Sequence, residues 1–142
     1  MIRYKLYQNK METSSAYNLW YARAVCDETY DTEMLAKHMS THNTPYSPGV
    51  IHGVLKDMIA CIKELLLDGK NVKLDDLAIF SVGIKSKGAA SVADFNVAEY
   101  VKGLKLRARA TGNLSTSTLK QDAIIKQLTK YSVSENAEGG EV

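Results

Sequence analysis

Cysteine is scarce in this chain, which has only Cys26 and Cys61 among its 142 residues. A disulfide framework or a zinc cluster needs more cysteines at shorter spacings, so neither kind of site is predicted. Cys61 also falls within an apolar helical pattern. We therefore expect two buried free thiols, because an unpaired cysteine packs as a small apolar side chain.

Long apolar runs are missing as well. No stretch approaches the ~18 apolar residues of a membrane-spanning helix. The opening segment, MIRYKLYQNK, alternates where a signal peptide would have an apolar block. The sequence therefore predicts a cytoplasmic protein with no membrane partner. Its length and its 45% hydrophobic content are enough for one folded domain with a core.

The patterns that would indicate an enzyme are also absent. The sequence contains no G-x-S-x-G motif and no phosphate-binding glycine loop. His38 and His42 are spaced as i and i+4, but the glutamate of an H-E-x-x-H zinc site is missing. Asp75 and Asp76 are adjacent, so their side chains diverge and suit a turn. We predict no enzymatic activity, no metal, no cofactor and no small-molecule substrate.

Positive charge is concentrated in one segment of the chain. The net charge is only +2, yet residues 85–110 hold six Lys or Arg against two Asp or Glu. Residues 31–84 hold five against seven. A local imbalance of this kind says more about an anionic partner than the overall charge does.

The first part of the chain predicts two strands and a short helix. Residues 2–7 alternate between apolar and polar side chains, and residues 19–25 mix aromatic and β-branched ones, so both are predicted strands. Hydroxyl side chains between Thr29 and Thr32 are predicted to cap a helix of two to three turns.

A second, longer helix is predicted over residues 50–66. Ser47 is its predicted N-cap, Pro48 suits the first helical position, and Gly69 ends it. Its apolar stripe is wider than a two-helix unit with one small sheet can cover. We therefore predict a twofold-symmetric homodimer in which a second subunit covers the rest.

The remaining residues predict a sheet, a last helix and a disordered tail. Val72 and Leu74 lead through a tight turn into a strand carrying Phe80, Val82 and Ile84. Residues 88–94 are small and flexible, residues 95–97 are predicted to be extended again, and residues 104–110 alternate strictly. Ser117 is predicted to cap a helix reaching Tyr131, and residues 132–142 have too little apolar content to order themselves.

The segment LKLRARA predicts a strand with a cationic face. Side chains on one face recur every two residues, so Lys105, Arg107 and Arg109 are expected about 7 Å apart in a row. Such a ladder suits a phosphate backbone, although it would equally serve as the solvated face of an antiparallel sheet. The neighbourhood favours the phosphate partner, because Lys85, Lys87 and Lys102 belong to the same β excursion.

The order of these elements resembles the bacterial histone-like HU and integration host factor superfamily. The resemblance rests on two helices, the segment GKNVKLDDLAIFSV with Phe80 and Val82 in an F-x-V pattern, a flexible β excursion, a basic strand and a terminal helix. It covers roughly residues 32–128, and residues 2–25 match a branch with an added N-terminal strand pair. The resemblance implies an α+β fold, with a helical base, an antiparallel sheet, a short two-stranded β-arm and an intertwined homodimer.

The chain departs from this family at the arm. The glycine-rich corner of the family is Asp76-Leu77-Ala78 here, and the arm segment KSKGAASVADFNV contains no proline. Family members insert a proline wedge between base steps, and here Val92 is the only candidate wedge, with Asp94 repelling phosphate. We therefore predict a mobile arm and only modest DNA bending.

Taken together, these features predict an architectural, sequence-nonspecific DNA-binding protein of the bacterial nucleoid. Its partners would be double-stranded DNA and a second copy of itself, and the alternative is a module of the same fold that mediates protein contacts. A helix-turn-helix is disfavoured because the second helix has few basic residues. The predicted domains are residues 1–28, 29–131 and 132–142. The predicted DNA-binding residues are Lys85, Lys87, Lys102, Lys105, Arg107 and Arg109.

Overall fold

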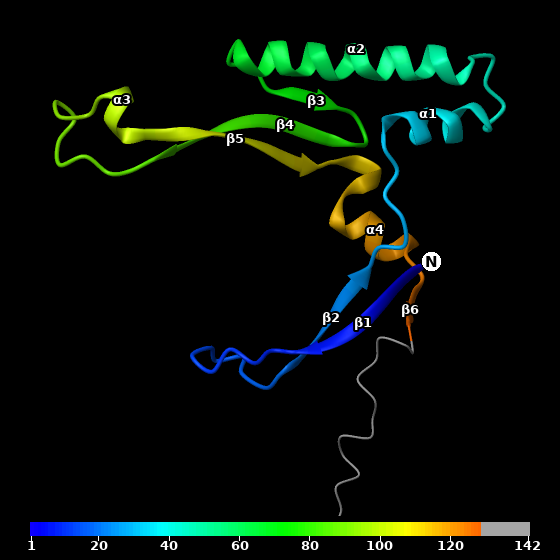
Figure 1. Cartoon of the computed structure of the whole chain (residues 1–142), viewed down its shortest axis with the longest axis horizontal. Helices are drawn as coiled ribbons and strands as arrows, with labels where there is room; N and C mark the ends of the chain where they lie inside the picture. The colour runs from blue at the N-terminus through cyan, green and yellow to red at the C-terminus, as the bar shows by residue number, and fades with distance from the viewer. Residues whose placement is uncertain (129–142) are drawn as a thin grey trace, which may run out of the picture. The chain divides into compact units, whose positions relative to one another are not determined.

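The computed structural model describes residues 1–128 (Figure 1). They form two compact units, one made of residues 1–29 and 121–128, the other of residues 30–120. Tyr131 and the tail predicted at residues 132–142 lie outside the described residues.

The N-terminal unit is built on a three-stranded sheet with the order β2-β1-β6. Strands β1 (Ile2–Gln8) and β2 (Trp20–Val25) form the predicted antiparallel pair. Between them, the backbone N–H of Asn9 donates to Leu19 O over 2.9 Å, and the N–H of Asn18 donates to Asn9 O over 2.7 Å. These bonds close the hairpin and set the register of its two strands.

The third strand, β6 (Ile125–Gln127), corrects the prediction of a long terminal helix. Helix α4 covers only Thr116–Asp122, so it begins one residue before Ser117 and stops short of Leu128. The chain then pairs in parallel with β1, as the N–H of Ile2 donates to Ile124 O over 2.7 Å and that of Leu128 to Tyr4 O over 2.9 Å. Two consecutive isoleucines favour an extended backbone, and the exposed edge of β1 supplies its hydrogen bonds.

The second unit begins with helices α1 (Thr32–Ser40) and α2 (Pro48–Leu67). The predicted Ser47 cap of α2 is confirmed, with its hydroxyl accepting from the N–H of Val50 over 3.3 Å. The cap of α1 is Asp31, where hydroxyl caps were predicted. Its carboxylate accepts from the N–H of Met34 over 2.8 Å, and a carboxylate there also complements the helix dipole.

Gly69 ends α2, as predicted. Its φ of 75° lies in the left-handed region, which glycine reaches at low cost. Its N–H donates to Leu66 O over 3.2 Å, and the N–H of Lys70 donates to Leu65 O over 3.0 Å, so the last carbonyls of the helix are satisfied.

Strands β3 (Val72–Leu74), β4 (Ala78–Ser86) and β5 (Val101–Ala110) form the second sheet in that order, with both pairs antiparallel. The predicted turn at Asp75 and Asp76 is confirmed. Asp76 has a φ of 61°, and its carboxylate accepts from the N–H of Asn113 over 3.3 Å. Figure 1 shows α2 lying along this sheet, while the β4–β5 hairpin continues beyond the end of the helix.

Burial is sparse in the described part of the chain. The buried apolar side chains there are Ala36, Ile51, Leu66 and Ala78, all in the second unit. Cys26 and Cys61 are both exposed, so the prediction of buried thiols was wrong; Cys61 lies beside the exposed residues Ala60 and Glu64 of α2. No helix within residues 1–128 has the length and hydropathy to cross a bilayer.

We predict that Gly69→Ala will lower the free energy of unfolding by about 1 kcal/mol, because alanine in the left-handed region is strained. The matched control is Gly53→Ala, in the interior of α2, where an added Cβ meets nothing within 4 Å. Alanine there should raise the free energy of unfolding by up to about 1 kcal/mol. Urea denaturation followed by circular dichroism measures both, and equal effects would contradict this account of the helix end.

Candidate nucleic-acid interface

The register of β4 and β5 gathers cationic side chains on one face of the second sheet. Ser81 lies opposite Arg107, Gly83 opposite Lys105, and Lys85 opposite Gly103. Residues directly opposite in an antiparallel pair project to the same side. Lys85 of β4 therefore projects from the same face as the basic residues of β5. We call these residues the cationic ladder: Lys85, Lys105, Arg107 and Arg109.

Lys73 of β3 belongs to the same face, which the sequence reasoning missed. It lies opposite Ile79, which in turn lies opposite Arg109. Its ammonium is 3.4 Å from the carboxylate of Asp75 in an exposed ion pair. The signal was present in the alternation of Val72, Lys73 and Leu74, since the residue between two core-facing side chains must face outward.

A glycine lets Arg107 lie flat on this face. A Cβ added at Gly83 would come within 2.5 Å of Arg107 Nε, so the guanidinium group crosses the bare backbone of the neighbouring strand. The guanidinium stays at the exposed surface, where its fork of donors can meet a phosphate.

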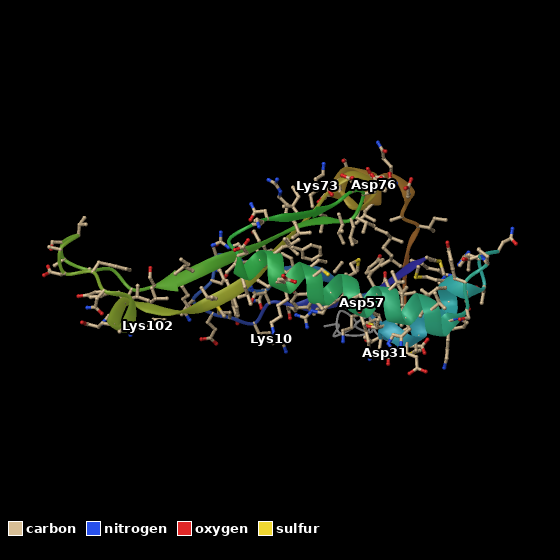
Figure 2. All side chains as sticks on the ribbon, turned by 90° about the horizontal axis from the view of Figure 1, so that it is seen from above. Lys10, Asp31, Asp57, Lys73, Asp76 and Lys102 are labelled. Carbon is tan, nitrogen blue, oxygen red and sulfur yellow. The ribbon has the colours of Figure 1, made fainter. Side chains whose placement is uncertain are left out.

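Lys102 and Lys87 lie away from the ladder. The register shifts between Lys85 and Ser86, which leaves Lys102 as the extra residue of a bulge between Gly103 and Val101. Figure 2 places Lys102 near the loop end of the hairpin, far from Lys73 and Asp76. The ammonium of Lys87 lies 3.0 Å from Glu99 Oε1 and 4.8 Å from the ring centre of Tyr100.

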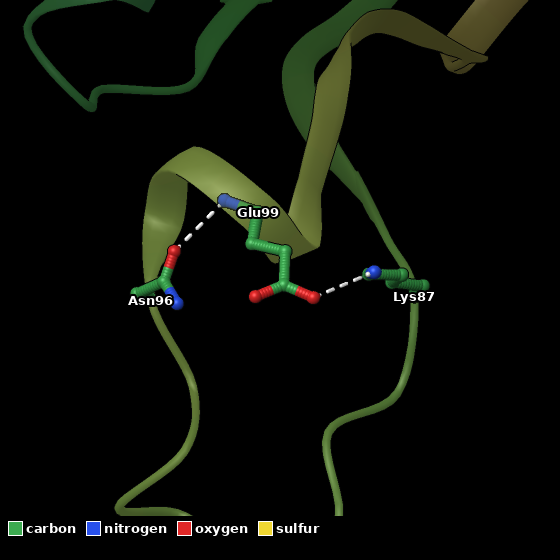
Figure 3. Close-up of polar contacts among 3 residues, drawn as sticks. All are labelled: Lys87, Asn96 and Glu99. Atoms are coloured by element: carbon green, nitrogen blue, oxygen red, sulfur yellow. Dashed lines mark hydrogen bonds and ion pairs between the residues drawn. The ribbon is translucent and has the colours of Figure 1, made fainter.

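The return segment of the hairpin corrects a second prediction. Asn96 has the predicted extended backbone, with φ −132° and ψ 149°, but Val97 is not extended because it begins a short helix, α3 (Val97–Tyr100). The side chain of Asn96 caps this helix by accepting from the N–H of Glu99 over 2.8 Å, and Glu99 reaches across to Lys87 (Figure 3). The rings of Phe95 and Tyr100 stack with their centres 5.4 Å apart. The cap and the stacked pair stabilise a helical turn that four residues could not form alone.

The tip of the loop is open to solvent. Val92 is 94% exposed, and Asp94 accepts a hydrogen bond of 2.6 Å from the hydroxyl of Ser91. The only direct backbone link between the two sides of the hairpin beyond Ser86 within the described residues is the N–H of Lys87 donating to Tyr100 O, over 2.9 Å. A tip with so few supporting contacts can change shape at low cost.

The opposite face of the second sheet is apolar. Opposite pairs such as Ile84 with Leu104 and Val82 with Leu106 project there. A groove of about 410 Å³ runs between this face and α2, and it is lined by Met58, Ile59, Ile62, Lys63, Leu66, Leu67, Leu74, Leu77, Phe80, Val82 and Leu106. Leu104 and Leu106 remain 61% and 64% exposed, so α2 leaves much of the face uncovered.

The histidines do not build a metal centre by themselves. His38 Nε2 and His42 Nε2 are 3.0 Å apart, although His42 lies beyond the end of α1. Within the part of the chain that the structure describes, no group of three or more His, Cys, Asp or Glu side chains could hold a metal ion.

A helical base, a three-stranded sheet and a basic hairpin define the class of HU-like proteins. Residues 1–124 match the HU-HIG family, described as an HU domain fused to a wHTH, Ig or glycine-rich motif. The chain therefore belongs to the HU-HIG family, and the predicted resemblance to HU is confirmed. No curated protein matches the chain.

A solved structure has a similar fold. It belongs to a protein from Bacteroides vulgatus ATCC 8482 that is described as a candidate bacterial DNA-binding protein. The TM-score is 0.64 at 14% sequence identity, over 89% of this chain and 47% of the other. This chain thus spans about half the length of that protein.

We predict that Asn96→Ala will destabilise α3 by about 1 kcal/mol, because the helix loses its cap. The amide of Lys87 donates to Tyr100 O across the hairpin, and the amide of Tyr100 donates to Asn96 O within the turn. Both amides should then exchange with deuterium about fivefold faster. Asn96→Asp is the matched control, since aspartate caps equally well and should preserve the protection. Unchanged exchange in Asn96→Ala would show that the Phe95 and Tyr100 pair alone maintains the turn.

Proposed function

We propose that the chain binds double-stranded DNA through the cationic ladder, largely without regard to sequence. The observation that carries this proposal is the β4–β5 register, which segregates Lys105, Arg107 and Arg109 from the apolar side chains of the same strand. Membership of the HU-HIG family and the fold of the Bacteroides protein support it. Both also point to a protein without enzymatic activity.

The ladder suits phosphates better than bases. It lies on a sheet face, and its side chains repeat about every 7 Å along the strand, so successive cations can follow a backbone. Phosphate contacts of this kind position a protein without reading sequence. Lys87 and Lys102 add positive charge near the loop end of the hairpin, where they can contact the backbone further along the duplex.

We propose only modest bending of the bound duplex. A sharp kink requires an apolar wedge that unstacks a base step at a cost of a few kcal/mol. The exposed tip offers Val92 alone, beside the carboxylate of Asp94. Backbone clamping by the ladder would therefore dominate, in keeping with a nucleoid-associated, histone-like role in the cytoplasm.

We further propose that two copies form a homodimer by covering each other's apolar surfaces. The groove beside α2 and the exposed Leu104 and Leu106 form a continuous apolar area on one side of the sheet. Burying the exposed part of each of these leucines would contribute roughly 1–2 kcal/mol. A second copy fits because it has the same exposed apolar face. Around a twofold axis, each of the two faces would bury the other.

A protein-interaction module with little DNA affinity is the alternative function. The uncovered apolar face favours it, because that face could bind a different protein. The cationic ladder favours DNA binding, because a row of positive charges would contribute nothing to a protein contact made through the apolar face. The two functions differ in their dependence on salt, which gives a direct test.

We predict that the full chain will bind a duplex of about 30 base pairs with a log–log salt slope near −5, for on the order of six neutralised phosphates. Replacing Lys105, Arg107 and Arg109 together with Glu should weaken binding at least tenfold for every sequence tested and flatten the slope. Fluorescence anisotropy across a series of KCl concentrations measures both quantities.

The matched control makes the same change of charge elsewhere. Lys37, Lys56 and Lys120 are exposed and lie on α1, α2 and α4. Their combined replacement with Glu should weaken binding much less than the ladder variant does. Equal losses in the two variants would show that only net charge matters, and unchanged affinity in the ladder variant would make the ladder an ordinary solvated face.

We predict that light scattering at micromolar concentration will give twice the mass of one chain. Leu106→Asp should shift the protein to monomers, because a carboxylate in the buried interface would lose its hydration. Val92→Asp is the control, since Val92 lies at the open tip, and it should remain dimeric. A monomeric wild-type protein would remove the basis for the dimer.

A further inference from the structure

A second cationic surface lies on the N-terminal sheet, in the unit that the proposed DNA contact does not use. The register pairs Lys5 with Arg23 and Tyr7 with Tyr21 across β1 and β2. Lys126 of β6 lies opposite Arg3 of β1. Paired residues project to the same side, so one face collects these side chains. We call it the tyrosine face; its residues are Arg3, Lys5, Tyr7, Tyr21, Arg23 and Lys126.

Charge on this sheet has one sign. The three strands read IRYKLYQ, WYARAV and IKQ, and they contain four basic residues and no Asp or Glu. All four basic residues belong to the tyrosine face, while Ile2, Leu6 and Ile125 alternate onto the other side. An ordinary solvated face mixes charges of both signs. Asp27, just beyond β2, forms an ion pair with Arg3.

Two aromatic rings lie among these cations and remain accessible. Tyr7 and Tyr21 are 37% and 38% exposed, with ring centres 5.9 Å apart and planes inclined by 33°. The guanidinium group of Arg23 lies 4.6 Å from the centre of the Tyr7 ring. Flat groups at this spacing on a rigid sheet form a platform on which planar ligands can stack.

We propose that the tyrosine face binds single-stranded nucleic acid. Unpaired bases would stack on Tyr21 and on the Arg23–Tyr7 pair, and phosphates would contact Lys5, Arg23 and Lys126. A duplex buries the faces of its bases within its own stack, so paired bases cannot use the tyrosines. Proteins that bind single strands without reading sequence combine aromatic platforms with a positively charged track in this way.

The extent of the face sets the size of its ligand. Arg3 and Tyr7 are four residues apart on β1, so the face measures about 14 Å along the strand. It would therefore contact only a few nucleotides, and affinity for a single strand should be moderate and salt-dependent. This proposal does not depend on duplex binding by the cationic ladder, because the two surfaces share no residue.

The test uses the full chain and two fluorescein-labelled single strands, oligothymidine and oligouridine, of about 12 nucleotides each. Tyr21→Ala should weaken binding of a single strand about tenfold, because one stacking contact is worth ~1–3 kcal/mol by alanine substitution. Tyr21→Phe keeps the ring and should bind as the wild type does. Tyr17→Ala, in the loop outside the sheet, is the matched control and should also bind normally. The two strands distinguish DNA from RNA as the source of the ligand.

Lys126→Glu provides a variant that does not alter the tyrosine pair. Lys126 is exposed on the edge strand β6. Its replacement should weaken binding of a single-stranded oligonucleotide severalfold and reduce the salt slope by about 1. The emission of Trp20, the one tryptophan in the chain and part of β2, reports whether the N-terminal sheet is folded in each variant.

Duplex binding separates this proposal from the proposed function. Tyr21→Ala should leave duplex affinity unchanged, and the ladder variant should lose duplex affinity while it retains most of its single-strand affinity. Parallel loss of both ligands in the ladder variant would place the single strand on the ladder and overturn the proposal. So would wild-type single-strand affinity in both folded variants, Tyr21→Ala and Lys126→Glu, or no single-strand binding by the wild type.

Discussion

The register of β4 against β5 is the constraint on which the second unit depends. Because side chains alternate along a strand, a slip of one residue would carry Lys105, Arg107 and Arg109 to the side that faces α2. The apolar alternation of both strands opposes such a slip, since it would expose a row of leucine and valine side chains to water and bury charges without partners. The cations are therefore placed by the hydrophobic residues between them. The regular pairing of β4 with β5 is interrupted at the bulge formed by Lys102. Beyond the bulge, the hairpin is stabilised by a helix cap and by contacts between aromatic rings.

The same alternation explains why the unit has so few buried residues. It directs Val82, Ile84, Leu104 and Leu106 to one side, but α2 covers only part of that side. Ile84, Leu104 and Leu106 are each more than 60% exposed, so each forgoes roughly 1–2 kcal/mol of burial. A domain has only 5–15 kcal/mol of net stability, so several such residues cannot be neglected. The homodimer proposed above would complete this core, because an equivalent apolar face of a second copy would cover it.

The sequence predicted the elements that carry their own signals. Ser47, Pro48 and Gly69 mark the ends of α2 through local backbone chemistry, and the strict alternation of residues 104–110 indicated a strand with a cationic face. The errors fall where a distant partner decides the conformation. Residues 125–127 form a strand because β1 offers an open edge, and no pattern within three residues can reveal that. The missed helix α3 is the exception, because its partners are local: Asn96 caps it and Phe95 stacks on Tyr100. Lys73 gives only a weak signal, because it lies in a three-residue strand outside the densest cluster of charge.

The two sheets share one arrangement, a basic face opposite an apolar face, but their basic faces differ in chemistry. In each, alternation places basic residues on one face and apolar residues on the other, yet only the N-terminal sheet adds aromatic rings to its basic face. The ladder consists of flexible cations on long stems, and in the proposed function these would neutralise phosphates and tolerate any sequence or local shape. Tyr7 and Tyr21 have rigid, planar rings, which can stack only on bases that are unpaired. A chain with both faces could therefore distinguish paired from unpaired nucleic acid without reading a single base, since pairing alone decides which of the two kinds of contact is available.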